Sequence, residues 1–182
     1  MIYTFHVIIE MLINDCENLY MVLMVTKNKI LIAYFTKGGA SEEYAKIISE
    51  TLKEKNYSVD IHNLAQETPD ISEYDTIILG TGVRMFRVYR QWKKILKQKE
   101  LEKKHLFIFL ASGMATEEPE KAVEKFLKPI VKKYDLKPVS LISFPGKIPE
   151  KWVKEGDEKE TMKPDVAIAW AEEISQHVQN HR

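Results

Sequence analysis

The sequence predicts an α/β domain whose five parallel strands form a doubly wound sheet in the order 2-1-3-4-5. Three observations support this prediction. Short β-rich runs alternate with longer segments of helical periodicity; the first run is continuously apolar, as in a strand covered on both faces; and the 182 residues, 45% of them hydrophobic, suffice for one compact core. No repeat, low-complexity tract or linker divides the chain, so a single domain is expected over residues 29–182.

The five strands are predicted from runs of apolar and β-branched residues that end at turn residues. The first run ends before Thr36, and the third ends at Gly80-Thr81-Gly82, which predicts a turn at that point. In chain order, the strands are expected at residues 30–35, 58–62, 75–79, 106–110 and 138–144.

Four helices are predicted from apolar residues that recur at helical spacing. Ser41 is expected to cap the first helix, because a serine hydroxyl can accept a hydrogen bond from the first turn. In the second helix Val88, Trp92, Ile95 and Leu96 are expected to face the core. The helices are expected at residues 41–55, 88–99, 118–134 and 165–178.

The strand order predicts where a ligand would bind. In doubly wound sheets, ligands lie at the carboxyl ends of the strands, where the winding direction reverses. In the order 2-1-3-4-5 this point lies between strands 1 and 3. The loops after Phe35 and Leu79, which both contain glycine and hydroxyl residues, are therefore expected side by side.

The loop between the first strand and the first helix is suited to an anion. Free N–H groups at a helix N-terminus and the helix dipole favour a phosphate, glycines let the backbone close around it, and hydroxyls at both ends add donors. The same residues also fit a plain turn before a capped helix, and both interpretations stay open. The loop residues are Thr36, Lys37, Gly38, Gly39, Ala40 and Ser41.

Motifs of other nucleotide-binding and signalling domains are missing. No G-x-G-x-x-G follows the first strand and there is no Walker loop, so neither a dinucleotide site nor a P-loop is expected. A phosphoacceptor receiver domain would need carboxylates near the ends of strands 1 and 3. Residues 34–36 are Tyr-Phe-Thr and residues 79–81 are Leu-Gly-Thr, which excludes that class.

Three segments, taken in order, resemble the flavodoxin family. Residues 34–45, Y-F-T-K-G-G-A-S-E-E-Y-A, resemble the flavodoxin phosphate loop. Residues 80–84, G-T-G-V-R, resemble the ring-contacting loop of the flavodoxin subfamily that includes menaquinone-dependent protoporphyrinogen dehydrogenase, and residues 144–147, F-P-G-K, resemble its segment after strand 5. The resemblance covers Lys29 to about His177. It implies a flavodoxin-like fold that binds FMN.

The resemblance also implies roles for particular residues. The loop residues 36–41 would hold the FMN phosphate, while the flavin carries the redox chemistry and the protein orients it. Phe86 either stacks on the flavin or packs against the helix that follows. The residues expected near the isoalloxazine ring are Thr81, Gly82, Val83 and Arg84 on one edge, and Ser112, Gly113 and Met114 on the other.

Two redox functions and one binding function remain as alternatives. The resemblance implies an FMN-dependent oxidoreductase, of the protoporphyrinogen dehydrogenase type, or a small electron-carrier flavodoxin. A flavodoxin-fold interaction module without cofactor is the third alternative. Lys and Arg total 27 and so do Asp and Glu, which gives no general attraction to nucleic acid. Between Arg84 and Lys104, however, nine basic residues face two Glu, which favours an anionic redox partner or an acidic small-molecule substrate, and a homodimer stays open.

The first 28 residues form an N-terminal extension of unclear role. Glu10, Asp15 and Glu17 interrupt its apolar residues and no basic residue precedes Lys27, so neither a secretory signal nor an integral membrane segment is expected. The lone Cys16 excludes an internal disulfide, and no Cys/His cluster predicts a metal site. A cytoplasmic location is therefore expected.

Overall fold

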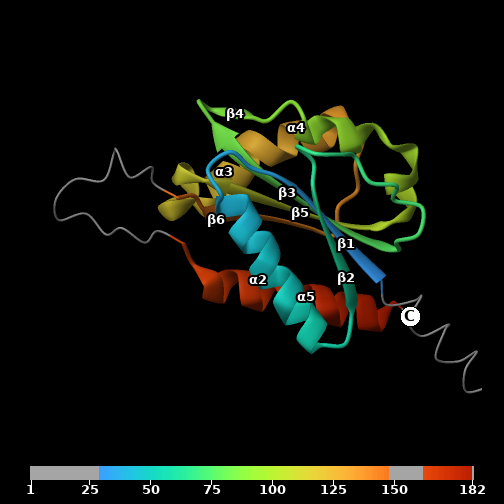
Figure 1. Ribbon diagram of the computed structural model, residues 1–182. Coiled ribbons are helices and arrows are strands. Elements are labelled where there is room, and N and C mark those ends of the chain that lie inside the picture. The colour runs from blue at the N-terminus through green and yellow to red at the C-terminus, as the bar shows by residue number, and fades with distance from the viewer. Residues whose placement is uncertain (1–28, 148–161, 182) are drawn as a thin grey trace, which may run out of the picture.

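The computed structural model describes residues 29–147 and 162–181, so the predicted N-terminal extension lies outside the described residues. Five parallel strands form the sheet in the order β2-β1-β3-β5-β6, which confirms the predicted flavodoxin-like topology. Figure 1 shows the sheet between two layers of helices. The strands are β1 (Lys29–Phe35), β2 (Ser58–Asn63), β3 (Thr76–Arg84), β5 (His105–Ser112) and β6 (Ser140–Pro145), and the short β4 (Arg87–Val88) pairs with β3.

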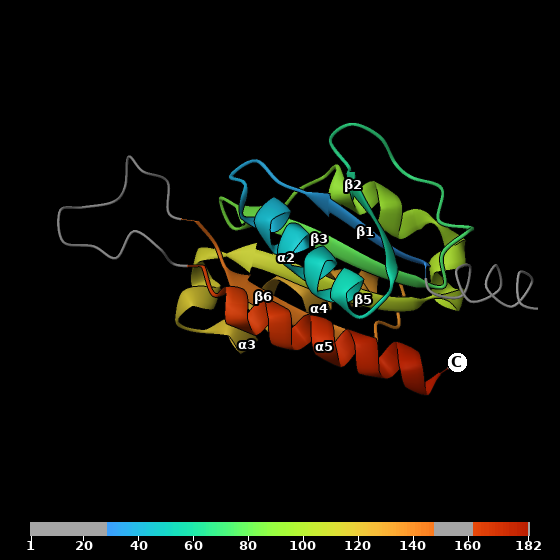
Figure 2. The same ribbon diagram turned by 60° about the horizontal axis from the view of Figure 1, so that its bottom comes forward.

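The two faces of the sheet are covered by different helices. Helices α2 (Ala40–Glu54) and α5 (Pro164–Asn180) lie together on one face (Figures 1 and 2). Side chains alternate along β1, so that Ile30 and Ile32 join the core under α2 and α5, whereas Leu31 and Ala33 join the core on the opposite face. The continuous apolar run of β1 therefore follows from its burial on both faces.

The N-cap of helix α2 (Ala40–Glu54) lies two residues before the predicted one. It is Gly39, with φ at +84°, and Ser41 lies inside the first turn. The prediction of Ser41 as N-cap was wrong because a glycine in the left-handed region can turn the chain into the helix without a side-chain cap. At the other end, Asn56 also has a positive φ of 64° and ends the helix.

The segment after β3 is not the predicted helix. Met85 and Phe86 have φ values of 48° and 61° and form a two-residue turn that pairs β4 antiparallel to β3. Two 3-10 helices, Trp92–Lys97 and Lys99–Lys103, follow. The four residues expected to face the core are nevertheless all buried. Val88 lies in β4, and the 3-10 helix that holds the other three brings every third residue to one side.

The predicted helix 118–134 exists but is divided into three parts. A wide turn with π-helical hydrogen bonding, Val123–Leu127, separates α3 (Pro119–Ala122) from α4 (Lys128–Lys133). Pro129 lacks an N–H group, and its ring would clash with the carbonyl group four residues earlier. The wider turn avoids this clash.

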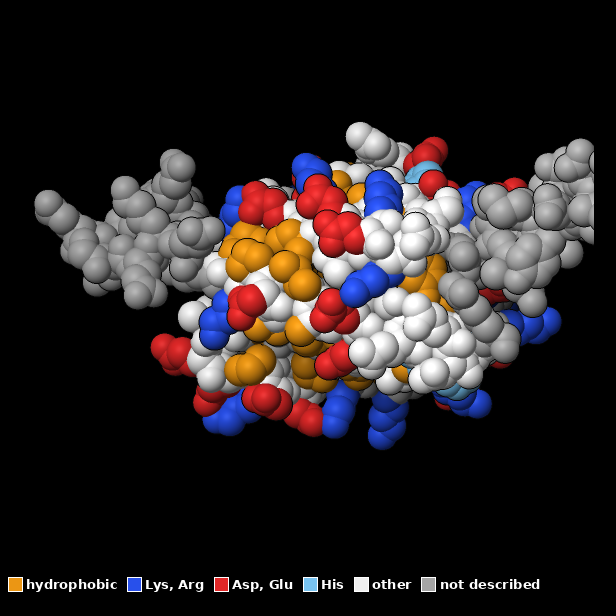
Figure 3. Space-filling model, turned by 90° about the horizontal axis from the view of Figure 1, so that it is seen from below, with side chains coloured by type: hydrophobic (Ala, Val, Ile, Leu, Met, Phe, Trp, Pro, Cys, Tyr) orange, Lys and Arg blue, Asp and Glu red, His pale blue; other side chains and the backbone are white. Residues whose placement is uncertain are grey.

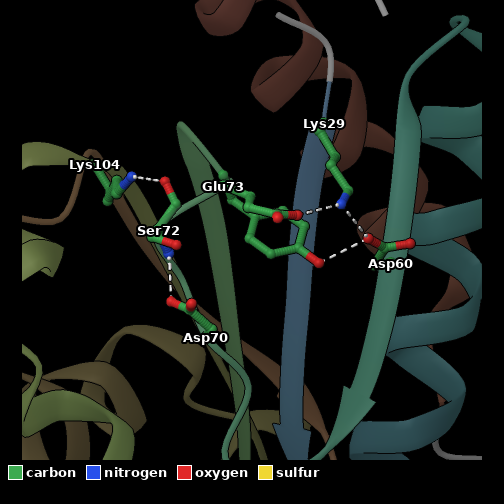
Figure 4. A network of polar contacts seen from close by, with 7 residues as sticks. Lys29, Asp60, Asp70, Ser72, Glu73 and Lys104 are labelled. Carbon is green, nitrogen blue, oxygen red and sulfur yellow. Dashed lines mark hydrogen bonds and ion pairs between the residues drawn. The ribbon is translucent and has the colours of Figure 1, made fainter. Parts of the chain in front are cut away.

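A polar cluster joins the strands at their amino ends, far from the predicted site (Figure 4). Lys29 Nζ lies 3.3 Å from Asp60 Oδ2 and 3.1 Å from Glu73 Oε2, so it connects β1, β2 and the segment before β3. The Tyr74 hydroxyl donates to Asp60 at 2.7 Å. This hydrogen bond, with the ammonium group of Lys29, lowers the pKa of Asp60. The cluster helps to fix this end of the sheet.

Charges of both signs cover the face formed by α2 and α5 (Figure 3). Two ion pairs there are Lys46 with Glu42 along α2 and Lys55 with Glu172 between the two helices. This face therefore has no strong field of one sign. No helix within residues 29–147 and 162–181 combines the length and apolar character needed to span a bilayer.

Three histidines meet where the end of α5 packs on the start of β5. His177 Nε2 lies 3.2 Å from His105 Nδ1, and the rings of His177 and His181 stack with centroids 4.1 Å apart. Within the described residues, no group of three or more His, Cys, Asp or Glu side chains is arranged to hold a metal ion. Burial, and the like charges that His181 and His105 would carry, lower the pKa of His177 below its ordinary value of 6.5.

We expect this cluster to make stability depend on pH. Because the pKa of His177 is lower in the folded state, its contribution to stability is present above pH 6.5 and is lost as the pH falls through the folded value. In chemical denaturation between pH 7.5 and pH 5.5, the free energy of unfolding should fall less steeply for His177→Gln than for the wild type. Parallel pH profiles for the two proteins would contradict this expectation.

Candidate functional site

The carboxyl ends of β1 and β3 lie side by side, as the strand order predicts. Phe35 pairs in register with Thr81, and Tyr34 pairs with Gly80. Strand β3 does not end at residue 79, however, but continues to Arg84. The predicted turn at residues 80–82 was therefore wrong, because these residues remain paired with β1 and β5.

Gly80 does not form a turn; its lack of a side chain lets the Phe109 ring pack closely against the backbone of β3. A Cβ atom at Gly80 would lie 2.7 Å or less from three carbon atoms of the Phe109 ring. Phe109 belongs to the neighbouring strand β5 and is fully buried. A glycine within a strand often marks such an approach, and here it lets the Phe109 ring lie against the backbone of β3 in the core under α2 and α5.

The loop between β1 and α2 is closed by its own hydrogen bonds. The Gly39 N–H donates to Thr36 Oγ1 at 2.9 Å, and the Gly39 carbonyl oxygen accepts from the N–H groups of Glu42 and Glu43 at 3.0 and 3.1 Å. The N–H groups of the first turn, at Ala40 and Ser41, have no acceptor inside the helix. They carry the positive end of the helix dipole, so the loop can receive an anion.

Ser41 connects this loop to the end of β3. The residue is only 1% exposed, and its Oγ has no hydrogen-bond partner within the described structure. A Cβ atom at Gly82 would lie 3.5 Å from this Oγ. A buried hydroxyl without a partner is unfavourable in the free protein, so Ser41 is a donor available to a ligand at the start of α2.

Tyr89 returns from the β3–β4 hairpin toward the same place. A Cβ atom at Gly82 would lie 3.2 Å from Tyr89 Cε2, and the Tyr89 and Phe35 ring centroids are 4.8 Å apart. Burial raises the pKa of the Tyr89 hydroxyl. Tyr89 is absent from the predicted site residues, because the hairpin that positions it was predicted as a helix.

The loops after β5 and β6 are joined to each other. The Gly146 N–H donates to the Ser112 carbonyl oxygen at 2.9 Å, and Ser112 Oγ accepts from the Ala115 N–H at 3.3 Å. Gly113 is exposed and Met114 is half-buried. These two residues therefore stand at the edge of the sheet next to the carboxyl end of β5, on the side where β1 and β3 also end (Figure 1).

The segment after β6 also reaches the start of α2. The Tyr44 hydroxyl donates to the Pro145 carbonyl oxygen at 3.0 Å and accepts from the Lys163 N–H at 3.1 Å. Lys147 forms an ion pair with Glu43, and its Nζ lies 4.0 Å from the position of a Cβ atom at Gly39. Lys147 is absent from the predicted site residues, because residues 144–147 carry part of the family resemblance but imply no role for the lysine.

Two predicted site residues of the β1–α2 loop, Lys37 and Gly38, are exposed, and four others lie along the hairpin. Thr81 is fully buried and its hydroxyl donates to the Gly82 carbonyl oxygen at 3.4 Å, while Val83 is half-buried. Arg84 is exposed. Phe86 is 75% exposed at the hairpin tip, where Lys125 Nζ lies 5.2 Å from its ring centroid. Phe86 therefore does not pack against a following helix in this structure.

Sequence comparison identifies one family. A family model described as a flavodoxin domain matches residues 31–162. No curated protein matches the chain.

Solved structures with the same fold include flavodoxins and larger proteins. Oxidised Flavodoxin 1 from Bacillus cereus is 16% identical, with a TM-score of 0.60 over 82% of this chain and 98% of its own. A flavodoxin from the domain Archaea is 15% identical, with a TM-score of 0.56 over 83% of this chain and 99% of its own. Rubredoxin oxygen:oxidoreductase from Desulfovibrio gigas is 13% identical, with a TM-score of 0.58 over 84% of this chain but only 36% of its own. With the matched family model and the observed sheet order, the chain belongs to the flavodoxin-domain family.

Proposed function

We propose that this protein binds FMN at the start of α2 and transfers electrons through it. The observation that carries the proposal is the buried Ser41 hydroxyl, which has no hydrogen-bond partner among the described residues and lies at a helix N-terminus in a flavodoxin domain. A phosphomonoester in the loop would accept hydrogen bonds from this hydroxyl and from free backbone N–H groups. Thr36 can add another, because its oxygen accepts from Gly39 while its own proton remains free to be donated.

The proposed flavin position uses the carboxyl ends of three strands. Residues 36–41 would hold the phosphate, the end of β3 would lie along one edge of the ring, and residues 112–114 would lie along the other. Exposed Phe86 would then stack on the ring and lose its exposure. Bound FMN would supply the capacity to accept and donate electrons, while these residues orient it and exclude water.

The basic segment favours an oxidoreductase that acts on an acidic substrate or partner over a carrier without charge preference. None of the nine Lys and Arg residues between Arg84 and Lys104 forms an ion pair with a carboxylate in the described part of the chain. Whereas Lys104 donates to the Ser72 carbonyl oxygen at the opposite end of the sheet, three of these cations, Arg84, Arg87 and Arg90, lie at or just after the strand end proposed to contact the ring. A substrate with carboxylates, as in the protoporphyrinogen dehydrogenase type, would be attracted to this edge.

The cofactor proposal is tested by titrating the purified apoprotein with FMN and following flavin fluorescence. We expect binding at one FMN per chain. Protein that binds no FMN under any condition but associates with a polyanion in a salt-dependent way would instead support an interaction module. Turnover of an acidic donor by the loaded protein, compared with electron exchange with neutral dyes, then separates the oxidoreductase from the carrier.

Replacement of Ser41 by alanine should change stability and FMN affinity in opposite directions. Removing a buried hydroxyl without a partner should raise the free energy of unfolding of the apoprotein by about 1 kcal/mol. Losing a hydrogen bond to a charged phosphate should lower FMN affinity about tenfold. Thermal unfolding and fluorescence titration measure the two effects.

Ser49 provides the matched control for this variant. It lies eight residues further along α2, and its Oγ is likewise buried without a partner in the described structure. Ser49→Ala should stabilise the apoprotein similarly and leave FMN affinity unchanged. Equal effects of both variants on FMN affinity would remove the support that Ser41 gives to the proposed site.

A further inference from the structure

We propose that Lys147 supplies the positive charge of the phosphate site and makes the site select flavins that carry a phosphate. This inference rests on the proposed FMN function and adds a residue from outside the loop. The family resemblance places the phosphate on the loop 36–41, whereas Lys147 comes from the segment after β6. Its role is inferred from its contacts with the start of α2.

The position of Lys147 is fixed through its backbone neighbours. The Pro145 carbonyl oxygen accepts the Tyr44 hydroxyl, and the Gly146 N–H donates to Ser112. A Cβ atom at Gly146 would lie 3.1 Å from the Ser112 carbonyl carbon, so the two loops are in close contact. This anchoring directs the Lys147 side chain toward the N-cap residue Gly39, where its Nζ lies 4.0 Å from the position of a Cβ atom.

A phosphate bound at the loop would meet negative charges, which the ammonium group of Lys147 can offset. A phosphomonoester carries about −1.5 to −2 charges at neutral pH. Glu42 and Glu43 occupy the first turn of α2 and would repel it. Lys147 pairs with Glu43, so its ammonium group is already at the site, and a phosphate could replace or share this partner. The N–H groups and hydroxyls of the loop supply hydrogen bonds but no net charge. The one lysine of the loop, Lys37, is exposed, whereas Lys147 Nζ lies beside the N-cap residue Gly39.

An ordinary surface ion pair is the competing explanation. The side chains of Lys147 and Glu43 are 42% and 44% exposed, and exposed pairs contribute little to stability. If the ion pair has only this role, Lys147→Gln should change the affinities for flavins with and without phosphate equally. Comparison of FMN with riboflavin, which lacks the phosphate, therefore separates the two explanations.

The experiment measures the dissociation constants of FMN and riboflavin by fluorescence titration at low and moderate salt. For Lys147→Gln we expect FMN affinity to fall about tenfold, a typical effect of one charge-assisted contact, and riboflavin affinity to stay unchanged. Lys147→Arg should restore most of the FMN affinity. For Glu43→Gln we expect FMN affinity to rise severalfold, since a competing and repelling carboxylate is removed.

Lys55→Gln is the matched control. Lys55 lies just beyond the other end of α2 and pairs with Glu172 at 3.2 Å, with comparable exposure. This variant should leave the affinities of both flavins unchanged. Loss of salt dependence of FMN binding in Lys147→Gln, but not in Lys55→Gln, would further support the proposal.

Two outcomes contradict the proposal and are distinguishable from each other. If the wild type binds FMN and Lys147→Gln leaves the ratio of FMN to riboflavin affinity unchanged, the role of Lys147 is wrong while the proposed function stands. If the wild type binds neither flavin, the proposed function fails, and this inference fails with it.

Discussion

Gly80→Ala is expected to destabilise the protein by about 3 kcal/mol or more, at the upper end of what overpacking a core costs. The added Cβ would lie 2.7 Å or less from three atoms of the Phe109 ring. The ring cannot easily move away, because its centroid lies 5.7 Å from that of Phe144 and 6.2 Å from that of Trp170. The clash would thus be transmitted to the core under α2 and α5.

Chemical denaturation of Gly80→Ala and of a control glycine variant tests this expectation. Gly113→Ala is the control, since a Cβ atom at Gly113 meets no atom within 4 Å. It should change the free energy of unfolding by less than about 0.5 kcal/mol. If Gly80→Ala does not fold, the double variant with Phe109→Leu should recover folding by making room for the Cβ. A Gly80→Ala protein as stable as the control would show that the close approach is unimportant.

Gly39→Val should abolish measurable FMN binding, with an affinity loss of at least about 100-fold. A β-branched residue is strongly disfavoured at the φ of +84° observed here. The loop would have to change conformation, which would break the Gly39 N–H bond to Thr36 and move the N–H groups at the start of α2. Each lost or displaced contact to a charged phosphate costs about 1.5 to 3 kcal/mol, and two such contacts exceed a 100-fold effect.

Asn56→Val is the control for backbone strain. Asn56 also has a positive φ, of 64°, and lies beyond the opposite end of α2, whose 15 residues span about 22 Å. Asn56→Val should lower thermal stability about as much as Gly39→Val does and should leave FMN affinity unchanged. If both variants lose FMN affinity equally, helix strain explains the loss and the loop conformation does not.

The sheet could be predicted from the sequence because its signals are local. The apolar run of β1 and the glycine-rich loop after it identify a buried parallel strand leading into a helix, and the alternation of elements predicts the strand order. The strand ends were less predictable. At Gly80 and Gly82 the glycines serve contacts with Phe109 and Tyr89, which depend on neighbouring segments.

The hairpin after β3 shows a second limit of local patterns. Val88, Trp92, Ile95 and Leu96 are buried as expected, but Val88 lies in β4 and the other three lie in a 3-10 helix. The turn at Met85 and Phe86 requires positive φ at two residues that rarely adopt it, so no turn residue signals it. Tyr89 was missed for this reason, and Lys147 was missed because only the folded chain brings it to Gly39.

The two hydrogen bonds of the Tyr44 hydroxyl affect how far the length of the connection between β6 and α5 can vary. Through one oxygen it joins Pro145 and Lys163, two positions 18 residues apart in sequence. The length of chain between these fixed points hardly affects the closure entropy, which grows only with the logarithm of loop length. Relatives could therefore gain or lose residues between Lys147 and Lys163 without disturbing the sheet or the hydrogen bonds of Tyr44.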